Sequence, residues 1–151
     1  VLDALIAEIG ADRTAVRISP LNSYQDMKHE DPVAYTKYFA EKADKLNLSF
    51  LHLMRADFFS AQTGDVVTPA RAAYTGNLVV NMGYGIEEGE EVLKAGTANA
   101  ICYGTKFLAN PDLVERVAAG AKLNEANQDT FYLGGTSPTG YTDYPTLQQQ
   151  A

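Results

Sequence analysis

Residues 78–111 decide the fold of this chain: they read LVVNMGYG, IEEGEEVLKAG and ANAICYGTKFLANP, with Thr97 before the last stretch. An apolar run ends in a glycine-containing turn, an amphipathic helical stretch follows, and a second apolar run ends at Tyr103-Gly104-Thr105. The order strand, helix, strand predicts a parallel βαβ unit. Both strands end at glycines, where backbone N–H groups can approach a ligand without interference from a Cβ atom. In barrel folds, paired loops of this kind after the last two strands commonly bind phosphate.

The same alternation of strand and helix extends through the chain. Strands are predicted at 14–19, 48–54, 78–81 and 98–103, and helices at 1–10, after Asp31-Pro32, and at 67–74, 86–95 and 113–119. This repetition favours one parallel sheet and an α/β fold. A complete eight-unit barrel needs roughly 250 residues, whereas the chain has 151. Four (βα) units, half of a TIM barrel, therefore fit.

An open four-stranded sheet would leave two unpaired edges. A flavodoxin-like sheet is the alternative fold with the same rhythm of elements. It is less favoured, because the loop after its first strand should bind phosphate, and here that loop begins at Pro20 and carries no glycine.

Composition and residue spacing argue against several classes of function. The net charge of −7 argues against nucleic-acid binding, which depends on Lys and Arg. No stretch approaches the ~20 apolar residues of a membrane span, and without a visible signal peptide the expected compartment is the cytoplasm. Cys102 lies in an apolar run and is predicted to be a buried core thiol. His29 and His52 are far apart in the sequence, so no metal site is expected.

Several residues are candidates for binding chemistry. Arg17 lies in an apolar strand near its end, where a cation must be paired or must meet a ligand. Two interpretations of Arg17 remain. It belongs to a buried structural ion pair, or it donates to an anionic ligand at the barrel mouth. Gly83 and Gly104 end successive strands, so their amides suit a phosphate. Lys106 could add charge, although a lone loop lysine is more often solvated.

The remaining candidates are aromatic or imidazole side chains. His52 is more often a hydrogen-bonded core histidine than a base. Phe58 and Phe59 lie in a loop, where they either pack under the loop or line a substrate pocket. The tail, residues 121–151, is expected to be an ordered loop in which Tyr132 can stack on a flat ligand. Its last glutamines, 148–150, are expected to fray.

Read together, seven stretches resemble the old yellow enzymes, the family of FMN-dependent ene reductases with a TIM-barrel fold. In chain order they are RISPLNSYQDM (17–27), DPVAYTKYFAEK (31–42), LSFLHLM (48–54), NMGY (81–84), ICYGTKFLANPDLVERV (101–117), LNEANQDTFY (123–132) and GYTDYP (140–145). The resemblance covers nearly the whole chain and places it as the C-terminal half of the barrel, strands five to eight. It implies a single partial domain over residues 1–151.

The resemblance also assigns residues to the cofactor. Arg17 corresponds to the arginine that contacts the pyrimidine edge of the flavin. Met82 and Gly83 match the turn whose backbone N–H groups hold the FMN phosphate, and Gly104 matches the glycine of the second phosphate turn. The family usually has Gly-Arg there, whereas this chain has Thr105, so a hydroxyl replaces a bidentate guanidinium.

Three further positions follow from the same resemblance. Tyr132 corresponds to an aromatic residue beside the dimethylbenzene side of the flavin. Phe58 falls where family members often place an aromatic residue over the substrate. Arg55 stands where the family often has an acidic residue, and the sequence alone offers no account of that change.

The resemblance implies FMN as cofactor, NAD(P)H as reductant, and reduction of activated C=C bonds by hydride from flavin N5. The family's substrate-gripping His/Asn or His/His pair and its tyrosine proton donor belong to the first half of the barrel. No catalytic residue is therefore assigned here, and the chain alone is expected to be inactive. The expected partners are the N-terminal half of the barrel or a second copy, together with a small activated alkene. The alternative is a non-catalytic half-barrel that self-associates or complements the missing half.

Overall fold

The computed structural model describes residues 1–132 and 137–150. The chain divides into two compact units, Val1–Cys102 and Tyr103–Ala151. The single partial domain over residues 1–151 stays a prediction. Of the tail predicted at 121–151, residues 133–136 and 151 lie outside the described residues.

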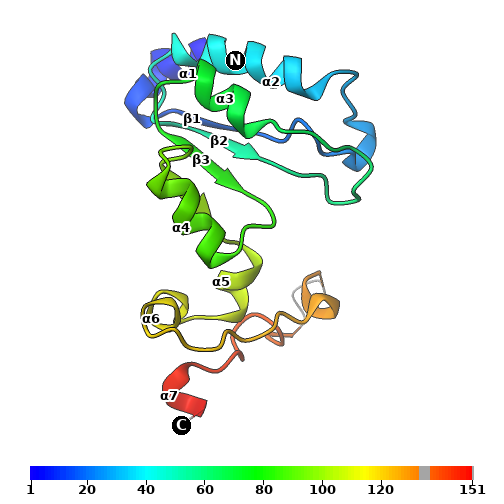
Figure 1. Ribbon diagram of the computed structural model, residues 1–151, viewed down its shortest axis with the longest axis vertical. Coiled ribbons are helices and arrows are strands. Elements are labelled where there is room, and N and C mark those ends of the chain that lie inside the picture. Colours follow the sequence, from blue (N-terminus) through cyan, green and yellow to red (C-terminus); the bar gives the residue numbers. More distant parts are fainter. Residues whose placement is uncertain (133–136, 151) are drawn as a thin grey trace. The chain divides into compact units, whose positions relative to one another are not determined.

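The first unit is built on a four-stranded parallel sheet (Figure 1). Its strands are β1 Ala15–Ile18, β2 Phe50–Met54, β3 Leu78–Asn81 and β4 Ala100–Cys102. They lie side by side in chain order, β1-β2-β3-β4, as strands do around a barrel. A flavodoxin-like sheet would reverse its order at a switch point, so that alternative is excluded. The predicted parallel α/β fold is confirmed.

Four helices accompany these strands. They are α1 Leu2–Ile9, α2 Pro32–Asp44, α3 Val67–Ala73 and α4 Ile86–Lys94, with short 3₁₀ turns at Ala11–Arg13 and Tyr24–Asp26. The sequence signal for the start of α2 is confirmed. The Asp31 side chain accepts a hydrogen bond from the backbone N–H of Ala34 at 2.9 Å, and Pro32 occupies the first turn.

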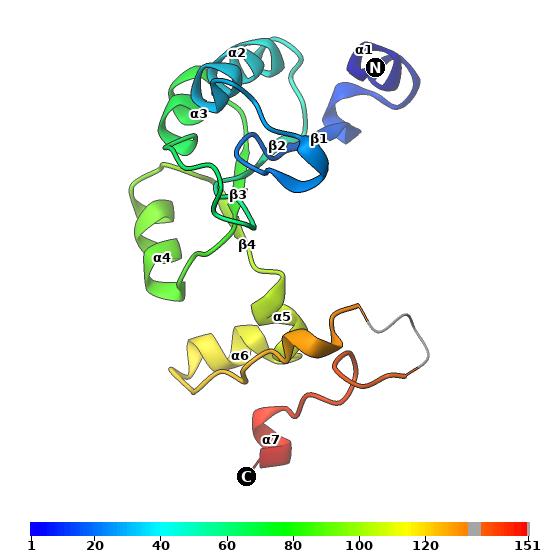
Figure 2. The ribbon, with the colours of Figure 1, turned by 90° about the vertical axis from the view of Figure 1, so that its right-hand side faces the viewer.

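The two faces of the sheet differ in burial, because successive strand residues point to opposite sides. One face carries fully buried apolar side chains, Leu51, Leu53, Leu78 and Val80. Figure 1 and Figure 2 place α2 and α3 over one face of the sheet, and these helices contribute buried alanines to the core, Ala40, Ala43 and Ala70. The strand register puts Arg17, His52, Val79 and Ala100 in one row on the opposite face, and none of them is buried. We call this the open face. In a closed barrel it would line the interior.

The environment of Cys102 differs from the one predicted from the sequence. Cys102 is the last residue of β4, and its side chain is exposed, so the prediction of a buried core thiol is wrong. The physical reason is its place in the sheet. Among the described residues β4 pairs only with β3, so it is an edge strand. Cys102 also follows Ala100 by two residues, which places its side chain on the open face.

The second unit contains α5 Thr105–Ala109, α6 Leu113–Ala118, a 3₁₀ turn at Gln128–Thr130 and α7 Leu147–Gln150. Helix α5 was not predicted, because five residues are too few to show a helical period. The glutamines expected to fray belong to α7, and the side chain of Arg116 contacts the last of them. Their fraying stays a prediction.

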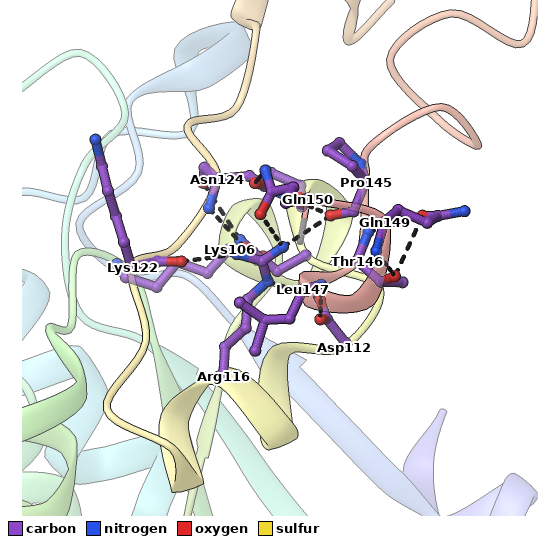
Figure 3. A network of polar contacts seen from close by, with 12 residues as sticks. Lys106, Asp112, Arg116, Lys122, Asn124, Pro145, Thr146, Leu147, Gln149 and Gln150 are labelled. Carbon is purple, nitrogen blue, oxygen red and sulfur yellow. Dashed lines mark hydrogen bonds and ion pairs between the residues drawn. The ribbon is translucent and has the colours of Figure 1, made fainter.

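Arg116 joins α6 to the tail (Figure 3). Its side chain is only 1% exposed. The Nε atom donates to Asp112 Oδ1 at 2.7 Å, and Nη1 donates to the carbonyl oxygen of Lys122 at 2.7 Å. The Nη2 atom donates to the carbonyl oxygen of Pro145 at 2.8 Å and to Gln150 Oε1 at 3.0 Å. A buried guanidinium is stable only when its donors are satisfied, and here the tail provides the acceptors.

Two further side chains complete this arrangement. Asn110, fully buried, accepts a hydrogen bond from the backbone N–H of Asn124 at 2.7 Å. Asp112 uses its second oxygen, Oδ2, to accept from the backbone N–H of Leu147 at 2.7 Å. The tail is thus ordered, over its described part, by polar side chains of α6 and the loop that precedes it.

Candidate functional site

The loops after β1, β2 and β3 leave the sheet at the same end of the strands, because the carboxyl ends of parallel strands lie side by side. Asp57, three residues after β2, organises two of these loops. Its Oδ1 atom accepts from the backbone N–H and the hydroxyl of Ser23, at 2.9 and 3.1 Å, and from the backbone N–H of Phe59 at 3.3 Å. Its Oδ2 atom accepts from the backbone N–H groups of Ala61 and Gln62, at 2.8 and 3.1 Å.

The electrostatics of Asp57 follow from these bonds. Its side chain is buried, and burial by itself raises the pKa of a carboxyl group. The hydrogen bonds from Ser23, Phe59 and Ala61 favour the ionised form more strongly, and they hold the pKa of Asp57 well below its usual range. The carboxylate therefore ties the loop after β1 to the loop after β2 as one structure at neutral pH.

Substitution of Asp57 by Asn is expected to lower the melting temperature at neutral pH, because an amide cannot accept from all these donors. The pKa of Asp57 is lower in the folded state than the ordinary value of 3.8. The ionised carboxylate therefore stabilises the fold above about pH 4, and the contribution is lost as the pH falls through the folded pKa. Thermal unfolding followed by circular dichroism from pH 2 to 7 measures this. The difference from wild type should be constant above pH 5 and shrink in acid, and the exposed Asp26→Asn is the control. Identical melting temperatures at pH 7 would contradict the role of Asp57.

The turn after β3 presents backbone donors. Met82 and Gly83 both have positive φ, 87° and 74°, a conformation that is rare for a residue with a side chain. Within residues 1–132 and 137–150, no group accepts a hydrogen bond from the backbone N–H of Met82 or Gly83. A Cβ atom placed on Gly83 would find nothing closer than Arg55 Nη2, at 3.9 Å. Successive backbone N–H groups in such a turn form a concavity suited to an anion.

Arg55, the first residue after β2, lies against this turn. Its Nε atom donates to the carbonyl oxygen of Met82 at 2.8 Å. Its Nη1 and Nη2 atoms donate to the two carboxylate oxygens of Glu88, at 2.5 and 3.0 Å. The guanidinium carbon lies 3.4 Å from the ring centre of Tyr84, which is buried. The Glu88 Oε2 atom also accepts from the backbone N–H of Gly85 at 3.3 Å, at the start of α4.

Arg17 lies on the open face and is exposed. No carboxylate of the described residues is within ion-pair distance, and its one polar contact is from Nη2 to Met54 Sδ, at 3.7 Å. The interpretation of Arg17 as part of a buried structural ion pair is therefore wrong. Its guanidinium is accessible to a ligand.

His52 is the neighbour of Arg17 across the β1–β2 register. Its Nε2 atom lies 3.2 Å from Asn81 Oδ1, so it is a hydrogen-bonded histidine, as favoured by the sequence, but on the open face. Partial burial and the positive charge of Arg17 lower the pKa of His52 and outweigh the opposing effect of Asn81. His52 is therefore neutral at pH 7.

The aromatic candidates are strongly exposed. Phe58 and Phe59 are 64% and 65% exposed, so packing beneath the loop after β2 is wrong for both. Tyr132 is 91% exposed, and its ring contacts Phe131 edge-on, with centroids 6.5 Å apart. The roles of Phe58 at a substrate and of Tyr132 at a flavin stay predictions.

The second phosphate turn belongs to the second unit. Gly104 precedes α5 with φ −85°, a value open to any residue, and Thr105 begins the helix. Both residues are exposed. The structure thus brings Arg17, Met82 and Gly83 to one sheet, while the approach of Gly104 and Thr105 to them stays a prediction.

Sequence reasoning missed Asp57, Glu88 and Asn81 as parts of this site. One signal was available: Glu88 is the third residue of a helix that follows a glycine turn, where an acidic side chain commonly caps the helix start. Nothing in the sequence connects Ser23 to Asp57, because the two residues are joined only by the packing of neighbouring strands.

A family model described as "NADH:flavin oxidoreductase / NADH oxidase family" matches residues 1–124. The chain belongs to this family. Among curated relatives, a probable flavin mononucleotide-dependent alkene reductase of Leishmania infantum is 47% identical, over 97% of this chain and 40% of the relative. The 12-oxophytodienoate reductase 2 of Arabidopsis thaliana is 34% identical, over 100% of this chain and 41% of the relative.

Solved structures of the family share this fold. The old yellow enzyme from Trypanosoma cruzi has a TM-score of 0.92 and 39% identity, over 97% of this chain and 38% of that chain. Morphinone reductase has a TM-score of 0.86 and 32% identity, over 99% and 40%. The resemblance to old yellow enzymes is confirmed. The chain spans about two fifths of the length of the relatives that it matches.

The predicted cofactor pair is shown for the family. Its description names NADH and flavin, the Leishmania relative's name gives flavin mononucleotide, and morphinone reductase has been solved in complex with tetrahydroNAD. Among the described residues, no group of three or more His, Cys, Asp or Glu side chains could hold a metal ion. No helix in the described part of the chain is long and apolar enough to cross a membrane.

Proposed function

We propose that this chain is the C-terminal half, strands five to eight, of an FMN-dependent ene reductase barrel that uses NAD(P)H. The observation that carries the proposal is the Met82–Gly83 turn, which offers two backbone donors without a partner among the described residues. Arg17 adds an accessible cation on the same sheet. An anion-binding turn and an exposed guanidinium on one sheet are what a phosphorylated flavin requires.

The residues of the first unit fit FMN. Arg17 and the Met82–Gly83 turn are separated by β2, which puts about two strand spacings, roughly 10 Å, between them across the sheet. Arg17 is level with Val79 in the strand register, so Met82 lies three residues, roughly 10 Å, further along β3, and the two sites are roughly 14 Å apart. One elongated ligand can therefore reach both. The turn would hold the phosphate, Arg17 would donate to the pyrimidine edge, and Phe58 would face the substrate. For Gly104, Thr105 and Tyr132, the flavin roles that the family resemblance implies stay predictions.

When bound, FMN supplies hydride transfer between NAD(P)H and an activated alkene, and the protein orients it and tunes its charge. In this proposal Arg17 stabilises negative charge at the pyrimidine edge, and the turn fixes the ligand's far end. The substrate-gripping pair and the proton donor come from the N-terminal half, so the chain alone is inactive.

Substitution of Arg17 by Ala in a complete barrel that carries this chain tests the site. Loss of a charge-assisted hydrogen bond costs about 1.5–3 kcal/mol, so the dissociation constant for FMN should rise roughly 10- to 150-fold. The rate of flavin reduction by NAD(P)H should fall as well. Flavin fluorescence titration and stopped-flow absorbance measure the two quantities, with the exposed Arg13→Ala as control. Unchanged flavin content and reduction rate would remove Arg17 from the site.

A second candidate function rests on the open face and on the sheet edges. Within the described residues, β1 and β4 each pair with one strand only, and unpaired edges promote association. The chain would then be a non-catalytic half-barrel that binds an N-terminal half or a second copy of itself. Light scattering and absorbance distinguish the candidates. A yellow assembly with a second polypeptide favours the reductase, and a colourless dimer of twice the 16.4 kDa chain favours the half-barrel.

A further inference from the structure

We infer that Arg55 is a positioning residue for the flavin phosphate: it fixes the Met82–Gly83 turn so that the backbone N–H of Gly83 faces the anion. This inference rests on the proposed function, because it concerns the same turn. It assigns a role to the residue that stands where the family often has an acidic side chain.

The orientation follows from the geometry of one peptide bond. The Met82 carbonyl and the Gly83 N–H belong to the same peptide unit, which is planar and trans, so the two groups point in opposite directions. Arg55 Nε holds the Met82 carbonyl oxygen at 2.8 Å. Whatever fixes that carbonyl also fixes the N–H on the other side. Arg55 therefore directs the Gly83 donor away from its own guanidinium, toward the space in front of the exposed turn.

The turn needs this support. Met82 has φ 87° although it is not glycine, and such a conformation persists only where the surroundings determine it. Arg55 is held in turn by two neighbours, Glu88 and Tyr84. Glu88 binds both Nη atoms, and the buried ring of Tyr84 lies 3.4 Å from the guanidinium carbon. Glu88 is anchored at the start of α4, where it also accepts from the N–H of Gly85.

The role requires a guanidinium rather than a positive charge alone. Arg55 uses Nε for the carbonyl, the two Nη atoms for the carboxylate and its flat face for the Tyr84 ring. A lysine ammonium is a point charge on a flexible stem and cannot make all three contacts at once. The carboxylate of Glu88 also offsets the charge of Arg55. Arg55 thus acts through the backbone and not as a direct charge on the phosphate.

The test compares FMN with riboflavin, which lacks the phosphate. Dissociation constants for both are measured by fluorescence titration in a complete barrel that carries this chain, as wild type, Arg55→Lys, Arg55→Met and Glu88→Gln. The adjacent, exposed Glu87→Gln is the matched control. A weakened phosphate contact in Arg55→Met should raise the dissociation constant for FMN about tenfold, with that for riboflavin unchanged. Arg55→Lys should lose nearly as much, and Glu88→Gln less.

Each result decides the inference. A selective loss for FMN supports it, and retained riboflavin binding shows that the variant is folded. Equal losses for both flavins would assign Arg55 a merely structural role and overturn the inference, as would unchanged FMN binding in both Arg55 variants. A wild-type barrel that binds neither flavin would overturn the proposed function, and the inference with it.

Discussion

Replacing Arg116 by Met is expected to lower the free energy of unfolding by about 3–5 kcal/mol, the usual cost of removing one partner of a buried ion pair. The substitution keeps much of the side-chain volume. It leaves Asp112 Oδ1 and the carbonyl oxygens of Lys122 and Pro145 without their donor. The tail, whose α7 also contacts Arg116 through Gln150, should lose its order first.

Urea unfolding followed by far-UV circular dichroism measures this difference, because the chain has no Trp for fluorescence. Lys122→Met is the matched control, since its side chain is exposed and only its backbone takes part in the network. The double variant Arg116→Met, Asp112→Leu should recover part of the loss, because no buried charge is then left alone. An unfolding free energy equal to that of the control would show that the network does not stabilise the tail.

The second large effect is expected in the centre of the sheet. Leu53 is fully buried on the helix-covered face, between Ile18 and Val80 in the strand register. Leu53→Ala should cost about 3 kcal/mol, from lost burial and from the cavity that remains. Urea unfolding of the variant and of wild type measures the difference.

The open face supplies the comparison for Leu53. Val79 lies on the adjacent strand and is only partly buried, so Val79→Ala in the isolated chain should cost less than about 1 kcal/mol. If the remaining strands close the barrel, Val79 becomes interior and the same substitution should cost more. Equal costs for Leu53→Ala and Val79→Ala in the isolated chain would contradict the assignment of the two faces.

Local sequence patterns were sufficient to predict most of the strands of the sheet and the helices beside it. The apolar runs at 48–54 and 78–81 are strands because β-branched and large apolar residues suit a pleated, buried surface. Asp31-Pro32 starts a helix because the side chain and the ring geometry act within one turn. The family resemblance added what patterns could not, namely the barrel and the flavin.

The errors concern neighbours that are distant in sequence. The run around Cys102 is as apolar as a central strand, and only the strand order shows that it lies at an edge. Arg17 has no ion-pair partner among the described residues because its face of the sheet is uncovered, which no local pattern reports. The contact from Arg55 to Met82 joins two loops that become adjacent only when β2 and β3 pair.

Cys102 is the chain's single thiol and is exposed at the end of β4. Its rate of chemical labelling therefore reports whether another polypeptide is bound at this strand. A thiol-specific reagent labels one known atom, and its rate follows solvent access to the sheet margin. Any polypeptide that docks along β4 would slow that labelling, without an introduced probe or a change to the sequence.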